Sequence, residues 1–139
     1  MLVLHQQIGE WLGVPVPKTD QQMLEIVERQ LPTSAIKRLV ALGITRPEID
    51  SLVIPLRTLQ HRRSRRQKLT VEESDRLLRV ARLLSQAKSV YGSRERALAW
   101  LRRPHPRLRG RTPLETLKTD TGSRLVEELL VQIDEGMFV

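Results

Sequence analysis

Apolar residues recur at intervals of three and four along most of this chain, and no stretch alternates strictly between apolar and polar residues. This spacing predicts helices, because one face of an α-helix repeats about every 3.6 residues and one face of a strand every second residue. Helices are expected over residues 20–30, 35–42, 46–53, 71–91, 94–102 and 121–135, with a further helix after Pro55. The pattern therefore predicts an all-α protein.

The apolar positions also predict which side chains form the core. The residues at helical spacing are Met23, Leu24, Ile26, Val27, Leu31, Ala35, Ile36, Leu39, Val40, Leu42, Ile49, Leu52, Val53, Leu77, Val80, Ala81, Leu84, Ala87, Tyr91, Ala97, Leu98, Trp100, Leu101, Leu125, Val126, Leu129, Leu130 and Ile133. Ile54 is expected to fill a turn, and Leu59 to tie the next helix to the core.

Several of these helices begin with residues that satisfy free backbone N–H groups. Three Thr-x-x-Glu pairs have the spacing of a capping box: Thr45 with Glu48, Thr70 with Glu73, and Thr112 with Glu115. Ser34 and Ser93 are expected to cap the helices that follow them. Gly43, Gly92 and Gly136 stand where helices are expected to end.

Residues 52–68 combine a short apolar element, a tight turn at Ile54-Pro55 and a strongly basic helix. Six of these residues are Lys or Arg and none is acidic. An apolar element, a turn and a basic helix are typical of a helix-turn-helix, and DNA is the commonest polyanion to which proteins present such a helix. On charge alone, an arginine-rich face exposed to solvent is an equally good interpretation.

A helix-turn-helix assigns roles to the side chains of its second helix. The first turns face base edges, which makes Arg57, Gln60 and His61 candidates for reading bases. The remaining basic side chains are candidates for phosphate contacts: Arg62, Arg63, Arg65, Arg66 and Lys68. An exposed position with no role is an equally good interpretation of His61. Because one such module buries little DNA surface, we expect a dimer on a two-fold site.

Charge is unevenly distributed along the 139 residues. The net charge of +8 and the pI near 11.0 favour an anionic partner. The last 27 residues nevertheless have a net negative charge. Their charged residues are Glu115, Lys118, Asp120, Arg124, Glu127, Glu128, Asp134 and Glu135. The basic stretch and the acidic end therefore predict two different functions for these two segments.

Other features of the composition exclude whole classes of function. Cysteine is absent, no apolar run approaches the roughly 20 residues of a membrane span, and the start does not resemble a signal peptide. We therefore expect a cytoplasmic protein that does not enter membranes. The few aromatic residues disfavour single-strand nucleic-acid binding, which relies on base stacking.

The sequence offers nothing that resembles a catalytic or metal site. His5, His61 and His105 are scattered, and there is no Gly-rich phosphate loop. Glu127 and Glu128 are adjacent on a predicted helix and so point to different sides, unlike a catalytic pair. We predict no enzymatic activity, no metal and no cofactor.

Two further segments allow more than one interpretation. The proline-rich loop over residues 102–111 has five arginines and no acidic residue, and it is either a solvated connector, a second phosphate contact or a docking surface. The apolar end Met137-Phe138-Val139 either folds back on its own core or projects into another protein.

The C-terminal half resembles the toxin-binding domain of the Xre/MbcA/ParS antitoxin family. The matching motifs are Trp100-Leu101, Pro104-His105-Pro106, Gly110-Arg111-Thr112-Pro113-Leu114 and Ile133-Asp134-Glu135-Gly136-Met137-Phe138. Upstream, Arg57-Thr58-Leu59, Arg62-Arg63 and residues 69–77 are similar to the family's Xre-type helix-turn-helix and its exit helix. The resemblance covers roughly residues 20–139, and it adds Thr58 to the DNA-binding candidates.

This resemblance implies an Xre-like helix-turn-helix domain followed by a small helical toxin-binding domain. The expected limits are residues 20–91 and 92–139, with residues 1–19 as an N-terminal extension to which we assign no role. The implied partner is a RES-domain toxin of ADP-ribosyltransferase-like fold that consumes NAD or modifies targets with it. The antitoxin is expected to form a homodimer within a larger complex and to repress its own operon by binding double-stranded operator DNA.

The resemblance also implies how the toxin is neutralised. The C-terminal segment is expected to cover the toxin's active site, with contacts from Asp134, Glu135, Gly136, Met137, Phe138 and Val139. A dimeric helix-turn-helix regulator without a toxin partner is the main alternative. A basic protein that binds RNA or a membrane surface accounts for the charge but not for the C-terminal end. Pro55 departs from the small capping residue usual at its position, which leaves the operator sequence open.

Overall fold

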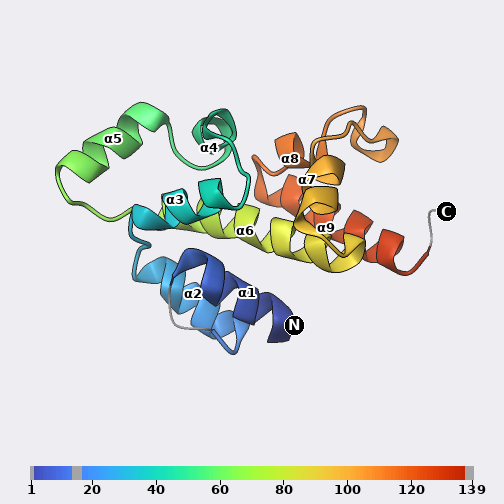
Figure 1. Cartoon of the computed structure of the whole chain (residues 1–139), viewed down its shortest axis with the longest axis horizontal. Coiled ribbons are helices and arrows are strands. Elements are labelled where there is room, and N and C mark those ends of the chain that lie inside the picture. Colours follow the sequence, from blue (N-terminus) through green and yellow to red (C-terminus); the bar gives the residue numbers. More distant parts are fainter. Residues whose placement is uncertain (1, 14–16, 137–139) are drawn as a thin grey trace. The chain divides into compact units, whose positions relative to one another are not determined.

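The computed structural model describes residues 2–13 and 17–136, and every regular element in these ranges is helical (Figure 1). The elements are α1 (Leu2–Leu12), α2 (Asp20–Glu28), α3 (Ser34–Ala41), α4 (Arg46–Leu52), α5 (Leu56–Ser64), α6 (Val71–Tyr91), α7 (Arg94–Leu101), the 3-10 turn η1 (Pro106–Leu108), α8 (Pro113–Thr116) and α9 (Asp120–Asp134). The all-α prediction is confirmed. Packing divides the chain into two compact units, 1–81 and 82–139. The predicted limit after Tyr91 coincides with the end of α6, whereas the packing changes inside that helix.

In the first unit, α1 packs against α3 (Figure 1). Its side chains Ile8 and Leu12 are fully buried, and Trp11 on the same helix is half-buried. The sequence analysis assigns no role to the first 19 residues. The sequence alone does not show this packing. A helix of 11 residues is stabilised by the partner that covers its apolar face rather than by helix propensity.

The local rules of helix capping hold at most of the predicted starts. Thr45 and Glu48 form a complete capping box, and Ser93 accepts a hydrogen bond from the Arg96 N–H. Ser34 is the exception, because it is the first helical residue and Thr33 occupies the cap position without a side-chain bond. A turn after Pro32 starts α3 instead, with the Ala35 N–H donating to the Pro32 carbonyl at 3.0 Å.

The second unit contains the last turns of α6 together with α7, η1, α8 and α9. Thr112 and Glu115 form the predicted capping box of α8. The last helix begins one residue earlier than predicted, at Asp120, because the Thr119 hydroxyl accepts the Gly122 N–H at 2.9 Å. A Cβ at Gly122 would overlap the Thr116 carbonyl oxygen, so only glycine allows α8 and α9 to approach this closely.

Three residues of the predicted apolar stripes lie at the surface. Leu24 is 56% exposed, Val40 is 37% exposed and Leu125 is 48% exposed. Each lies at the edge of a stripe whose centre is buried, as Val126 and Leu130 are on α9. The stripes were therefore predicted too wide, because periodicity gives a direction but not the extent of the covering element.

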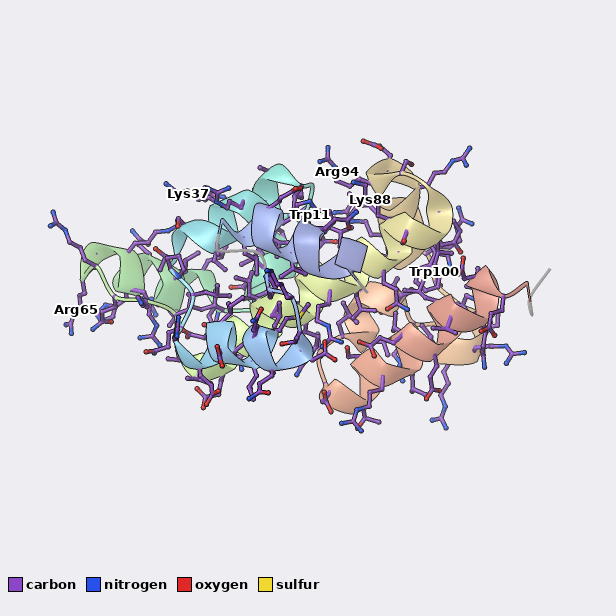
Figure 2. The ribbon with its side chains drawn as sticks, turned by 90° about the horizontal axis from the view of Figure 1, so that it is seen from below. Trp11, Lys37, Arg65, Lys88, Arg94 and Trp100 are labelled. Atoms are coloured by element: carbon purple, nitrogen blue, oxygen red, sulfur yellow. The ribbon has the colours of Figure 1, made fainter. Side chains whose placement is uncertain are left out.

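Aromatic residues are few, and the two tryptophans lie in different units (Figure 2). Trp100 on α7 is 8% exposed, and its ring centroid lies 5.9 Å from that of Tyr91 and 6.4 Å from that of His105. Burial raises the pKa of Tyr91 above its ordinary value, against the opposing charge of Arg103. No helix in the described ranges is long and apolar enough to cross a membrane.

Candidate functional site

Helices α4 and α5 form the helix-turn-helix that the sequence predicts. The two turn residues Val53 and Ile54 are buried, and the Ile54 N–H donates to the Ile49 carbonyl at 3.0 Å. Leu59 on α5 is also buried, which ties the second helix to the core as expected. The apolar turn thus fixes the angle between the two helices, and Arg57, Gln60 and His61 of α5 are left at the surface.

The first residue of α5 is capped by a side chain that the sequence analysis did not identify. Pro55 occupies the cap position and has no side-chain acceptor. The Asp50 carboxylate, on α4, accepts the Leu56 N–H at 2.9 Å instead. A negative charge also suits the positive end of a helix. Asp50 therefore compensates for the unusual proline, and no local motif would have revealed it because the two residues are six apart.

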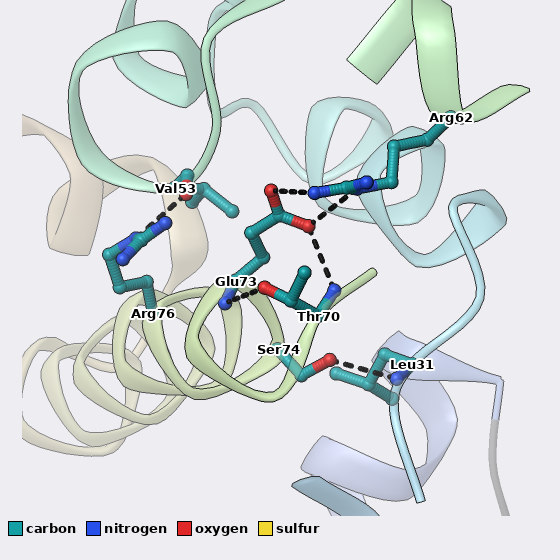
Figure 3. Close-up of polar contacts among 7 residues, drawn as sticks. All are labelled: Leu31, Val53, Arg62, Thr70, Glu73, Ser74 and Arg76. Atoms are coloured by element: carbon teal, nitrogen blue, oxygen red, sulfur yellow. Dashed lines mark hydrogen bonds and ion pairs between the residues drawn. The ribbon is translucent and has the colours of Figure 1, made fainter. Parts of the chain in front are cut away.

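The start of α6 holds α5 from the opposite end (Figure 3). The Glu73 carboxylate accepts hydrogen bonds from Nε and one terminal nitrogen of Arg62, both at 3.0 Å. One of its oxygens also accepts the Thr70 N–H at 2.8 Å, and the Thr70 hydroxyl accepts the Glu73 N–H, which completes the predicted capping box. One buried carboxylate thus caps α6 and anchors the last turns of α5.

Two neighbours of Glu73 bind other segments of the same unit (Figure 3). The Arg76 Nε donates to the Val53 carbonyl at 2.8 Å, which holds the turn between α4 and α5. The Ser74 hydroxyl is buried and accepts the Leu31 N–H at 2.9 Å, which fixes the connection between α2 and α3. We call Glu73, Ser74 and Arg76 the α6 anchor. Through these residues α6, the helix that follows the helix-turn-helix in the chain, holds the helix-turn-helix in place.

Ionisation of Glu73 is favoured by its partners. Burial alone would raise the pKa of this carboxyl, but the hydrogen bonds and charge of Arg62 and the hydrogen bonds of Thr70 hold it below its ordinary value. The hydrogen bond to Glu73 in turn raises the pKa of Arg62. The pair is therefore fully charged at neutral pH.

The exposed side of α5 contains the predicted base-reading residues. Arg57, Gln60 and His61 are exposed and share one side with Ser64, along an open hollow of about 570 Å³ that Thr58 also lines. Thr58 itself is half-buried. The structure thus brings the three base-reading candidates together.

The predicted phosphate contacts fall into two groups. Arg63, Arg65, Arg66 and Lys68 are exposed, and Figure 2 shows Arg65 at the surface beyond the end of α5. The Lys68 ammonium donates to the Arg29 carbonyl at 3.4 Å. Arg62 differs from this group because its guanidinium is paired with Glu73 and only 23% of its side chain is exposed. Its main contact is within the fold.

The basic loop, residues 102–111, is closed by its own backbone. The His105 N–H donates to the Arg111 carbonyl at 3.0 Å, and the Gly110 N–H donates back to the His105 carbonyl at 3.1 Å. Leu108 in the middle of η1 is buried, which fastens the loop to the second unit. The unpredicted turn η1 starts at His105, whose Nδ1 accepts the Arg107 N–H. The loop is a defined structure rather than a loose connector.

The acidic end of α9 lies at the surface. Asp134 and Glu135 are exposed, and Gly136 ends the helix with φ of 76° while its N–H donates to the Ile133 carbonyl at 3.0 Å. Met137, Phe138 and Val139, which were also predicted to bind the toxin, lie outside the described residues. In the described ranges, no group of three or more His, Asp or Glu residues could hold a metal ion.

These features define a helix-turn-helix protein with a second, small helical domain. Two family models match the chain. Residues 22–82 match the antitoxin Xre-like helix-turn-helix domain, and residues 86–136 match the antitoxin Xre/MbcA/ParS C-terminal toxin-binding domain.

Curated relatives agree with this assignment. Antitoxin Xre of Pseudomonas putida is 38% identical over 125 residues, which cover 90% of this chain and 79% of the relative. Antitoxin Xre of Yersinia enterocolitica is 34% identical over 61% of this chain and 58% of the relative. The Prs ADP-ribosylating antitoxin of a Sphingobium species is 27% identical over 81% of this chain and 78% of the relative.

The chain belongs to the Xre antitoxin family. It is an antitoxin of a toxin–antitoxin system, with a regulatory rather than an enzymatic role, and its two domains imply a toxin and DNA as partners. The alternative of a regulator without a toxin partner does not agree with the toxin-binding domain.

Proposed function

We propose that this antitoxin works through two surfaces. The exposed side of α5 binds operator DNA, so that the antitoxin represses its own operon. The end of α9 and the residues that follow it cover the active site of a RES-domain toxin that consumes NAD or ADP-ribosylates a target.

The DNA surface rests on one observation, which is that α5 is anchored at both ends while its basic side is free. Asp50 caps its start, and Glu73 holds its last turns through Arg62. Pre-organised side chains lose less entropy on binding, so a fixed recognition helix favours specific contacts.

Within this surface we assign three roles. Arg57, Gln60 and His61 read base edges, with Thr58 beside them, since Arg suits guanine and Gln suits adenine. Arg63, Arg65, Arg66 and Lys68 bind phosphates, which sets affinity and register. Arg62 positions α5 through Glu73. We also propose a homodimer, because two copies of α5 on a two-fold operator supply the specificity that a single module lacks.

The toxin surface is supported by charge and by the comparisons. Asp134 and Glu135 are exposed at the end of the domain that matches the toxin-binding model. NAD-binding clefts contain cationic groups for the pyrophosphate, and these groups would attract carboxylates. The name of one relative, Prs ADP-ribosylating antitoxin, links a member of this similarity group with ADP-ribosylation. In our proposal Gly136, Met137, Phe138 and Val139 enter the cleft behind the two carboxylates.

The toxin surface is tested by co-expression with the toxin encoded beside this antitoxin, following growth and cellular NAD. We expect the toxin alone to stop growth and deplete NAD, and the full antitoxin to restore both. Removing residues 137–139, or replacing Asp134→Asn together with Glu135→Gln, should abolish the rescue without loss of folded protein. The charge-matched control Glu25→Gln with Glu28→Gln, on exposed positions of α2, should rescue like the wild type. A toxin that leaves NAD unchanged would contradict the NAD-consuming assignment.

The DNA surface is tested by binding to the duplex upstream of the antitoxin's own coding sequence. The variant Arg57→Ala with Gln60→Ala should lose the preference for this duplex over a shuffled one, because it loses base contacts. Equal discrimination by the variant and the wild type would refute the assignment of α5 as the reading helix.

A further inference from the structure

A groove beside α5 combines apolar and cationic side chains from three helices. It has a volume of about 440 Å³ and separates α5 from α3 and α4. Its apolar part includes Ile36, Ile49 and Leu59, which are nearly fully buried, and Val40, which is 37% exposed. We call it the lateral groove. Every element that lines it belongs to the first unit.

Cations surround this groove without matching acids. Lys37 on α3, Arg46 on α4 and Arg63 on α5 line it, and all three are exposed. Among the described residues that line it, none is acidic, and within the described part of the chain these three side chains have no ion pair. Figure 2 shows Lys37 at the surface of α3. Three unpaired cations from different helices in one groove require an anionic occupant or solvent to balance them.

The position of the groove relative to the reading side of α5 indicates the occupant. Gln60 lines both the lateral groove and the hollow that contains Arg57 and His61. These two sides of α5 are about a third of a turn apart, since each helical residue advances about 100°. A helix about 10–12 Å across fills a major groove about 12 Å wide, so a phosphate strand must run along each flank of the inserted helix. One flank of α5 is the lateral groove.

We propose that the lateral groove binds the sugar–phosphate backbone of one operator strand, with Lys37 and Arg46 as DNA contacts that complement Arg63. Val40, which is exposed, lies against the carbon atoms of a deoxyribose, and the three cations hold the adjoining phosphates. This inference rests on the proposed role of α5 in DNA binding, and it adds contacts on α3 and α4 that the basic stretch 57–68 does not contain.

The experiment measures binding to the upstream duplex as a function of salt, using the full chain. Each phosphate contact contributes about 0.9 to the slope of log K against log salt concentration, so Lys37→Gln with Arg46→Gln should reduce the slope by about 1.8. Affinity at 0.1 M salt should fall about 5–10-fold for each contact, equally for the upstream and the shuffled duplex. The control Lys18→Gln with Arg29→Gln, which removes the same charge from exposed positions outside the groove, should leave the slope within about 0.3 of the wild type.

A second measurement locates the contact on DNA. Replacing single phosphates of the duplex by neutral methylphosphonates should identify a position that weakens binding of the wild type and of the control. At that position the Lys37 and Arg46 variant should lose no further affinity, because the contact is already absent.

The outcomes separate the two proposals. If the wild type does not bind duplex DNA, the operator-binding function fails and this inference fails with it. Two results would exclude the lateral groove while leaving α5 as the DNA surface. In the first, the wild type binds and the groove variant has the same salt slope as the wild type. In the second, each methylphosphonate weakens binding of the groove variant as much as it weakens binding of the wild type. Circular dichroism of each variant serves as the control for folding.

Discussion

Replacing Glu73 by glutamine is expected to destabilise the first unit by about 2–3 kcal/mol, because hydrogen bonds to charged groups each contribute about 1.5–3 kcal/mol. The carboxylate accepts two hydrogen bonds from Arg62 and one from the Thr70 N–H. A glutamine oxygen in the place of Oε1 preserves the bonds from the Arg62 Nε and the Thr70 N–H, but its NH₂ group replaces Oε2 and faces the terminal nitrogen of Arg62, donor against donor. The Arg62 charge is left without its partner at a position that is 23% exposed.

Glu115→Gln is the matched control. Glu115 completes the same kind of capping box with Thr112, but it is exposed, and its carboxylate pairs with no arginine in the part of the chain that the structure describes. Because glutamine also fits the last position of a capping box, the control should cost less than about 0.5 kcal/mol. The difference between the two variants reports the Arg62 pair together with the burial of Glu73.

Urea denaturation at pH 7, followed by circular dichroism, measures both costs as changes in the free energy of unfolding. The double variant Glu73→Gln with Arg62→Met should cost at least about 1 kcal/mol less than the sum of its single variants, since either single change leaves the other group mispaired. Equal stability of the Glu73→Gln and Glu115→Gln proteins, or strict additivity in the cycle, would refute the reasoning.

Four further results are expected. Lowering the pH should remove the contribution of Glu73: its pKa is below the ordinary value in the folded protein, so its stabilisation is complete above the unfolded pKa of about 4.3 and is lost as the pH falls through the folded pKa. The urea midpoint of the wild type should therefore fall more steeply in acid than that of Glu73→Gln. Asp50→Ala should lower stability by about 0.5–2 kcal/mol by uncapping α5 and should weaken operator binding, which anisotropy titration checks, whereas Asp50→Asn retains an acceptor. Gly122→Ala should destabilise the second unit by about 1–3 kcal/mol or more, because the alanine Cβ overlaps the Thr116 carbonyl, and a lower melting temperature would show this. Leu108→Ala should cost about 2–5 kcal/mol and should make the basic loop sensitive to protease, which cleavage mapping checks.

What the sequence predicted well is local. The capping boxes at Thr45, Thr70 and Thr112 depend on residues three apart, and the structure forms all of them. The full span of α6 and its end before Gly92 also follow from short-range signals. The helix-turn-helix and its exposed basic helix were predictable for the same reason, since charge, turn and apolar turn residues are contiguous.

What the sequence did not predict depends on contacts between distant residues. The sequence predicts Arg62 as a phosphate contact, and only the fold places it against Glu73, 11 positions later. No local pattern in the sequence predicts that Arg76 donates to the Val53 carbonyl. The lateral groove is of the same kind, because Lys37 and Arg46 lie outside the basic stretch and reach it only through packing of three helices.

The separation of the two tryptophans gives the protein an intrinsic fluorescence reporter in each unit. Trp11 belongs to the first unit and Trp100 to the second, where Tyr91 and His105 lie beside it. The tryptophan emission of a protein with Trp11→Phe comes only from Trp100, and that of a protein with Trp100→Phe comes only from Trp11. Comparing their denaturation curves would reveal whether the DNA-binding and toxin-binding halves melt together or one after the other, without any attached dye.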